Sequence, residues 1–301
     1  MHQNCAGNRN WKLHGLCMNS VVSIYGVDGG GAGATGLRIS SLNAFPFRMS
    51  SLIAAYGTIL SDPAQKIWLF ATITVVFAAL GRAMRGVTTS GALAGAAVSF
   101  AILLGAGLPG FAALVALFVL TWASTRIGYT RKQRLGIAEA RVGRNERQVL
   151  ANLGIAGICS TLYAFAGHEQ RLLLAMAAAL AEAAADTVSS EIGQALGGTP
   201  RLITNWSEVP PGTDGGITIS GTLAGSVGAI VVCVVAVMTG LFGWRLFPLC
   251  AGAGIAGMLV DSLLGATLER RNVLGNNGVN FISTAIAAVL AVVLSQVSRT
   301  L

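Results

Sequence analysis

Long apolar runs alternate with short polar segments along most of the chain. Each run is about as long as a helix that crosses a bilayer. They predict eight spans, at 66–81, 88–106, 109–126, 149–166, 171–192, 217–242, 246–268 and 279–298. Only 11% of the residues are charged, whereas a soluble enzyme would carry about a quarter. The pattern therefore predicts an all-α polytopic transmembrane helix bundle.

The basic residues are concentrated in alternate loops of this eight-span arrangement. The loops 82–87, 127–148, 193–216 and 269–278 hold most of the arginines, whereas the opposite set has little beyond Arg171 and Arg245. Because basic loops stay on the cytoplasmic side, this set is predicted to be cytoplasmic. The net charge of +8 is then mainly a topology signal. We expect a multi-pass protein of the plasma (inner) membrane, in contact with the lipid bilayer and not with nucleic acid.

Residues 1–48 differ from the rest. They are rich in Gly and Asn and lack the apolar core of a signal peptide. We interpret them as a disordered extension, or as the product of a start codon assigned too early, with Met49 as the true start. Residues 49–301 are then a single integral membrane domain. The segment spells GxGxxG, but no strand precedes it and no helix with an acidic residue follows, so a dinucleotide-binding turn is not predicted.

A short repeat marks the start of two spans. Residues 86–95 read GVTTSGALAG and residues 216–225 read GITISGTLAG. Both copies open a helix that leaves the basic side, so the two helices should be parallel. Their Thr and Ser residues can cap free N–H groups, and two such N-termini facing one cavity would favour an anion. The alternative is that they are packing helices with nothing bound.

Carboxylates inside the predicted spans are the main candidates for chemistry. Glu182 and Asp186 are four residues apart and share one helix face, whereas Glu191 points away or lies at the helix end. Asp261 lies in span 246–268, and like Asp186 it is roughly 10 Å from the basic end at 1.5 Å per residue. Two carboxylates at matched depth predict a Mg²⁺ site. The alternative is a structural ion pair, for example between Asp186 and Arg85, or a protonated carboxyl in a helix contact.

The loop 193–216 offers a place for phosphate. Its segment VPPGTDGG combines rigid prolines with glycines that allow positive φ, and such a turn can present backbone N–H groups to an anion. No GxxxxGK[ST] motif occurs. Phosphate would then be held by arginine, backbone and metal, with Arg82, Arg85 and Arg201 nearest. An ordinary Gly/Pro turn is the alternative.

Six ordered motifs between about residues 66 and 298 carry a family resemblance. They are RGVTTSGALAG, RNERQVLANLG, ADTVSSEIGQ, PRLITNWSEVPPGTDGG, DSLLGATLE and NNGVNFIST. With them the chain resembles the domain-of-unknown-function-92 family of integral membrane proteins, whose plant members include the chloroplast phytyl-phosphate kinase. Three positions depart from the family pattern: Val188 replaces a tryptophan, and Asp214 and Glu269 stand where Asn and Gln are more frequent.

The resemblance implies a membrane-embedded prenyl-phosphate kinase. A phosphoryl group would pass from a nucleoside triphosphate to an isoprenoid monophosphate at the cytoplasmic face. In this reading Asp186 and Asp261 bind Mg²⁺, and Glu182 supports them or is a further ligand. The residues expected to bind substrate and phosphate are Arg82, Arg85, Ser90, Arg201, Gly212, Thr213, Gly215, Gly216, Ser220, Asn277 and Asn280. A transporter of a lipid phosphate or small anion is the alternative, and the oligomeric state is left open.

Overall fold

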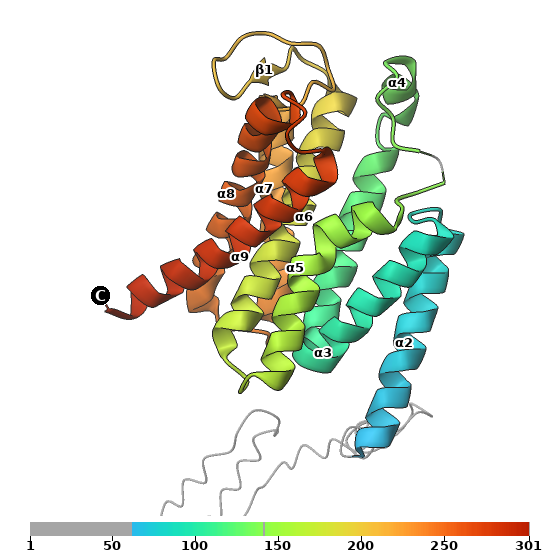
Figure 1. The fold of residues 1–301 in the computed structure, drawn as a ribbon, viewed down its shortest axis with the longest axis vertical. Helices are drawn as coiled ribbons and strands as arrows, with labels where there is room; N and C mark the ends of the chain where they lie inside the picture. Colours follow the sequence, from blue (N-terminus) through green and yellow to red (C-terminus); the bar gives the residue numbers. More distant parts are fainter. Residues whose placement is uncertain (1–61, 141, 301) are drawn as a thin grey trace, which may run out of the picture. The chain divides into compact units, whose positions relative to one another are not determined.

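The computed structural model describes residues 62–140 and 142–300, and it is almost entirely helical (Figure 1). The predictions made for residues 1–48 lie outside the described residues. The elements are α2 (Pro63–Ala83), α3 (Thr89–Arg126), α4 (Tyr129–Arg134), α5 (Glu146–Phe165), α6 (Gln170–Leu196), β1 (Arg201–Leu202), β2 (Gly216–Ile217), α7 (Ile219–Met238), η1 (Trp244–Leu246), α8 (Phe247–Leu264), the π-helical turn η2 (Gly265–Glu269) and α9 (Asn276–Thr300). Within these residues, seven helices are long and apolar enough to cross a membrane.

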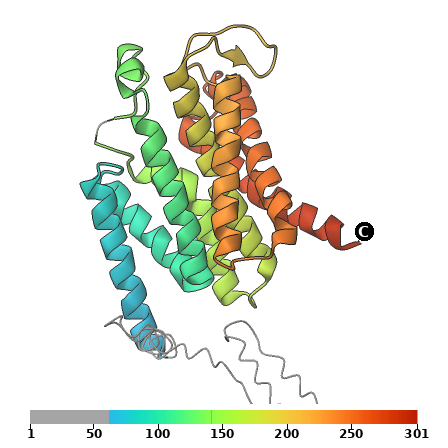
Figure 2. The ribbon, with the colours of Figure 1, turned by 180° about the vertical axis from the view of Figure 1, so that it is seen from behind.

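Helix α3 contains two of the predicted spans. Gly107 has φ 64° and ψ −159°, which breaks the helix, and Pro109 follows it. The chain turns back at this point, so the two halves of α3 run in opposite directions (Figures 1 and 2). The halves correspond to the predicted spans 88–106 and 109–126. The all-α membrane bundle is thereby confirmed, with eight membrane-length segments in the described part of the chain.

Helix α6 forms the centre of the bundle. It contacts α3, α5, α7, α8 and α9, and most of its residues are buried. Its run of alanines lets neighbouring backbones come close. A Cβ on Gly225 of α7 would lie 2.5 Å from the carbonyl oxygen of Ala185, and one on Gly254 of α8 would lie 2.9 Å from Cβ of Ala181. These glycines therefore fix how deeply the helices next to α6 can pack.

Both copies of the repeat form the predicted N-terminal cap. The hydroxyl of Thr88 accepts from the Gly91 N–H at 3.1 Å, and that of Thr218 accepts from the Gly221 N–H at 3.0 Å. The two copies then pack against different partners. Gly91 lies against the backbone of Arg144, whereas Gly221 lies against the backbone of Ser189 on α6. The repeat is thus a shared capping motif in two different surroundings.

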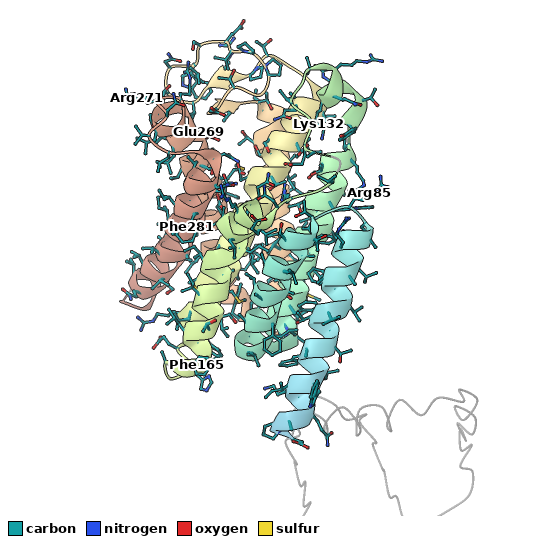
Figure 3. All side chains as sticks on the ribbon, turned by 45° about the vertical axis from the view of Figure 1, so that its right-hand side comes forward. Arg85, Lys132, Phe165, Glu269, Arg271 and Phe281 are labelled. Carbon is teal, nitrogen blue, oxygen red and sulfur yellow. The ribbon has the colours of Figure 1, made fainter. Side chains whose placement is uncertain are left out.

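The basic loops gather at one end of the bundle, which we call the basic end and define by the connections 127–145, 197–218 and 270–275. Arg85, Lys132 and Arg271 lie toward this end, and Phe165 lies at the other (Figure 3). The strands β1 and β2 form a small antiparallel hairpin there, with Arg201 opposite Ile217. The loops that carry the candidate chemistry are therefore on the same side.

Candidate functional site

A polar cavity of about 470 Å³ lies at the basic end. Its walls come from the ends of α5, α6, α8 and α9 and from the connections 131–144 and 197–218. The polar side chains that line it include Arg131, Glu139, Arg144, Gln148, Asn152, Asp186, Thr187, Asp214, Thr218, Asp261, Ser262, Glu269 and Asn280. This cavity brings several of the predicted motifs together.

Asp186 and Asp261 meet in this cavity. Helix α8 runs parallel to α6, since Gly254 packs on Ala181 and Gly257 packs on Glu182. Asp186 lies four residues beyond Glu182 and Asp261 four residues beyond Gly257, so the two aspartates reach the same level. Both side chains line the same cavity. The predicted pairing of two carboxylates from two parallel helices is present in the structure.

Helix α9 orients the Asp261 carboxylate. The Ser283 hydroxyl donates to Oδ2 of Asp261 at 3.1 Å. With its amide turned so that both of its ends are satisfied, Asn280 donates to the same oxygen at 3.2 Å and accepts from Nδ2 of Asn152 at 3.2 Å. These bonds fix one carboxylate oxygen and leave the other side of the group facing the cavity. Asn280 is thus where the sequence analysis expected it, but Ser283 and Asn152 were not anticipated.

Glu182 lies one helical turn below Asp186 and outside the lining of the cavity. Its side chain is only 1% exposed, and its Oε1 has no hydrogen-bond partner. A Cβ on Gly257 would come within 2.6 Å of its Cγ, so the glycine makes room for it. A buried carboxyl oxygen without a partner is costly. Glu182 therefore lies behind the two aspartates, and its role as their support or as a further ligand stays a prediction.

Arg144 is a cavity residue that sequence reasoning missed. Its backbone forms a parallel bridge with Val87, and its carbonyl accepts from the Thr88 N–H at 2.9 Å. Its Nη2 donates to the hydroxyl of Thr187, the residue after Asp186, at 3.3 Å. The start of the first repeat therefore holds an arginine beside the aspartates. The motif RNERQVLANLG, with the Asn145 capping box that opens α5, was the signal that could have indicated it.

The glycine turn covers the cavity. Gly212 and Gly215 have φ of 84° and 74°, and together with Thr213 and Gly216 they line its wall. A Cβ on Gly215 would lie 2.4 Å from the backbone nitrogen of Ala266, so the turn sits directly on η2. Single π-helical turns of this kind often occur at functional sites. The loop and the carboxylates therefore line one cavity.

The other predicted binding residues lie outside the residues that line the cavity. Arg82 donates to the Thr89 hydroxyl (3.3 Å), Ser90 bonds to the Glu146 carboxylate, Arg201 pairs with Glu208 (2.9 Å), and the Ser220 hydroxyl lies 3.4 Å from that of Thr218. Arg85 lines two smaller neighbouring cavities, and Asn277 is one residue past the cavity residue Asn276. Ser90 of the first repeat points toward α5 rather than toward the aspartates, because its hydroxyl bonds to Glu146 at the start of α5.

The cavity is strongly acidic. Its lining contains Glu139, Asp186, Glu191, Asp214, Asp261 and Glu269, against Arg131 and Arg144. Among the described residues the ion pairs are Lys132–Glu191, Arg171–Glu169 and Arg201–Glu208, so neither Asp186 nor Asp261 is in one. The alternative pairing of Asp186 with Arg85 is not present. Carboxylates at this depth usually have a partner, so either a bound cation or a shared proton would satisfy this cluster.

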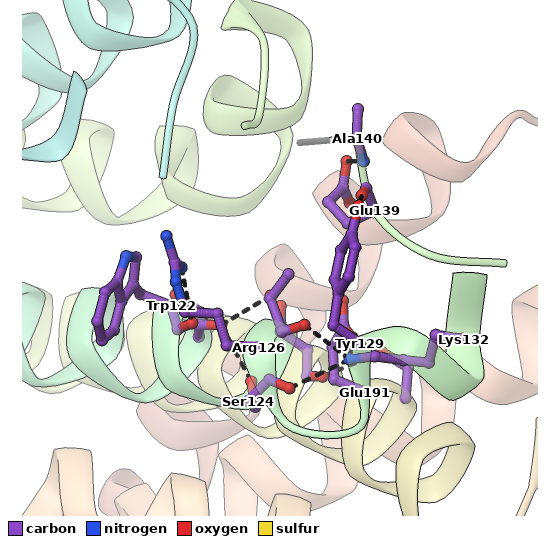
Figure 4. Close-up of polar contacts among 12 residues, drawn as sticks. Trp122, Ser124, Arg126, Tyr129, Lys132, Glu139, Ala140 and Glu191 are labelled. Carbon is purple, nitrogen blue, oxygen red and sulfur yellow. Dashed lines mark hydrogen bonds and ion pairs between the residues drawn. The ribbon is translucent and has the colours of Figure 1, made fainter. Parts of the chain in front are cut away.

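Glu191 has a structural partner. It pairs with the fully buried ammonium group of Lys132, which also donates to the carbonyls of Ser124 (3.2 Å) and Thr125 (2.8 Å) (Figure 4). Glu191 lies near the end of α6, as one reading of the sequence expected. This contact ties α4 to α6, so the basic connection 127–145 is anchored beside the cavity.

The chain matches the integral membrane protein family DUF92 over residues 72–288. It belongs to this family. All of the residues that line the cavity fall within the matched residues. An uncharacterized membrane protein of the archaeon Methanocaldococcus jannaschii is 36% identical over 236 residues, which cover 76% of this chain and 94% of that protein. An uncharacterized membrane protein of the cyanobacterium Synechocystis is 36% identical over 192 residues, covering 62% of this chain and 74% of the relative.

A plant relative belongs to the same group. Protein VTE6, chloroplastic, of Arabidopsis thaliana is 31% identical over 198 residues, which cover 63% of this chain. The match spans 60% of the Arabidopsis protein, less than two thirds of its length. No solved structure matches the chain. Membership of an integral membrane family agrees with the multi-pass fold.

Proposed function

We propose that the protein is a membrane-embedded prenyl-phosphate kinase, which transfers a phosphoryl group from a nucleoside triphosphate to an isoprenoid monophosphate. The observation that carries this proposal is the meeting of Asp186 and Asp261 in a polar cavity that also contains Arg144 and the Gly212–Gly216 turn. The resemblance to the plant phytyl-phosphate kinase, and the relationship to VTE6 of Arabidopsis, support the same chemistry.

The donor set fits Mg²⁺. No group of three or more His, Cys, Asp or Glu side chains suited to a metal occurs in the described residues. Magnesium does not require one, because it is commonly bound by one or two carboxylates, water and substrate phosphate oxygens. Asp186 and Asp261 would hold the ion, whose positive charge would offset that of the phosphates. An acidic cavity would otherwise repel the phosphates.

The chain's own groups would position the reactants. Arg144 offers a planar guanidinium that matches two phosphate oxygens at once. The backbone N–H groups of the Gly212–Gly216 turn would hold the nucleotide from the opposite wall. A terminal phosphate oxygen of the prenyl monophosphate would attack the γ-phosphorus in line, the bond to the bridging β,γ-oxygen would break, and the nucleoside diphosphate would leave. Such a transfer needs positioning and charge stabilisation rather than a covalent nucleophile.

Purified protein in lipid nanodiscs tests the proposal. We expect it to convert farnesyl or geranylgeranyl monophosphate to the diphosphate with γ-labelled nucleoside triphosphate and Mg²⁺, and to stop when the metal is chelated. Thin-layer chromatography of the labelled lipid measures the product. Absence of labelled diphosphate across a panel of nucleotides and prenyl monophosphates would contradict the proposal.

Transport of a lipid phosphate or small anion is the second candidate. Intramembrane carboxylates without ion pairs are also found in transporters, and this cluster is of that kind. The cavity, however, is lined from the basic end alone, whereas alternating access needs groups reachable from both faces. Uptake of labelled phosphate into proteoliposomes, without formation of a diphosphate, would favour the transporter.

We expect the basic end to face the cytoplasm, because basic loops are retained on that side. In a background with Cys5 and Cys17 replaced by Ser, Leu135→Cys and Val273→Cys should be labelled by an impermeant maleimide only from the cytoplasmic side. Both positions are exposed loop or turn residues at the basic end. His168→Cys, at the other end, should react only from outside. Labelling of positions 135 and 273 from opposite sides would refute the eight-span topology.

A further inference from the structure

We infer that the hydrocarbon chain of the substrate lies in a slot between α2, α3 and α5, with its phosphate in the polar cavity. We call this the α2–α3–α5 slot and define it by Val87, Gly95, Leu117, Phe118, Val149 and Leu153. The inference rests on the proposed prenyl-phosphate substrate and assigns the path of its chain. It also names Gly95 as a residue that controls which chains fit.

The slot consists of two small cavities next to the polar one. The first, of about 80 Å³, shares five wall residues with the polar cavity, among them Arg144, Gln148 and Asn152. The second, of about 60 Å³, shares Val87, Leu117, Phe118, Val149 and Leu153 with the first. The three spaces are therefore consecutive along one side of α5.

The character of the walls changes along this line. The polar cavity is lined by carboxylates and arginines, the first small cavity combines Arg144 and Asn152 with Leu117 and Phe118, and the second is lined by apolar side chains and glycine. An amphiphile with a charged head and a hydrocarbon tail matches this order. Its head would lie beside Asp186 and Arg144, and its tail would extend toward α2, which lies at the edge of the bundle and packs mainly on α3.

Missing side chains create the space. A Cβ on Gly95 would have Val149 Cγ1 as its nearest neighbour at 4.0 Å, and one on Gly81 would be 3.5 Å from Val87 Cγ2. Neither glycine has a positive φ, so backbone geometry does not require glycine there. A longer side chain at position 95 would project into the second cavity and would compete with a hydrocarbon chain.

Photo-crosslinking tests the path without relying on catalysis. The probe is a farnesyl monophosphate that carries a diazirine on its chain, added to the full-length protein in nanodiscs. We expect mass spectrometry to find the label on α3 and α5 peptides that contain residues of the slot, and unlabelled farnesyl monophosphate to suppress it. Labelling confined to lipid-facing residues of α7 or α9, or suppression by phosphatidylglycerol alone, would overturn the inference and indicate a bilayer lipid.

Gly95→Leu tests the size of the slot. In this variant, suppression of the photo-crosslink should require about tenfold or more farnesyl monophosphate, since a few carbon atoms in an apolar pocket change selectivity by this order. Binding of nucleotide should be unchanged. Gly252→Leu is the matched control, because Gly252 is an exposed glycine of α8 with nothing within 4 Å. Equal competition in both variants would refute the inference.

The two proposals can fail separately. Crosslinking in the slot without diphosphate formation would keep the chain path and reject the kinase. Diphosphate formation with crosslinks elsewhere would keep the kinase and reject the path. If Gly95→Leu does not fold, as judged by size-exclusion chromatography, the crosslinked positions in the unaltered protein decide the question.

Discussion

Asp186→Asn and Asp261→Asn are each expected to reduce phosphoryl transfer by about 10²- to 10³-fold, the range found when one preorganised electrostatic group is removed from an active site. The two carboxylates come from parallel helices and face one cavity, so loss of either should disable the same metal site. The rate of labelled diphosphate formation at fixed Mg²⁺ measures the effect. Raised Mg²⁺ should partly restore the single variants.

Two neutralising substitutions in the same cavity are the controls. Asp214→Asn and Glu269→Gln remove a negative charge from the cavity wall, but they introduce the residues that are more frequent in the family pattern. They should change the rate only a few-fold. The double variant of Asp186 and Asp261 should be little worse than either single one, because residues that act as a unit are not additive. Full activity of Asp186→Asn would end the metal-site proposal and favour the transporter.

Glu191→Gln is expected to destabilise the protein by about 3–5 kcal/mol, the cost of removing one partner of a buried ion pair. Lys132 is fully buried, and its ammonium group has Glu191 as its anionic partner. Neutralising Glu191 leaves the Lys132 ammonium group buried without an anionic partner. Thermal unfolding in detergent, followed by size-exclusion chromatography, measures the change.

The exposed pair Arg201–Glu208 provides the matched control, because the side chains are 52% and 60% exposed. Glu208→Gln should change the stability by less than about 1 kcal/mol. Adding Lys132→Met to Glu191→Gln should recover most of the lost stability, because the unpaired charge is removed with its partner. A Glu191→Gln variant as stable as the unaltered protein would show that the pair does not anchor α4.

The sequence was sufficient to predict the spans and the matched depth of the two aspartates on parallel helices. Apolar runs of bilayer length determine the helices, and the alternation of basic loops determines which ends lie together. A single span, 217–242, lies between spans 171–192 and 246–268, so both aspartate-bearing helices run the same way. A spacing of four places Glu182 and Asp186 on one face. These inferences need only local periodicity and the number of crossings.

Tertiary structure alone decided which cations and hydroxyls join the aspartates. Arg82, Arg85 and Ser90 are near the first repeat in sequence, but Ser90 bonds to Glu146 and the repeat's backbone instead holds Arg144 in place. Ser283, Asn152 and the Lys132–Glu191 pair likewise depend on contacts between residues far apart in the chain. The direction of a side chain in a loop or at a helix end is set by its packing partners. No local pattern in the sequence encodes those partners.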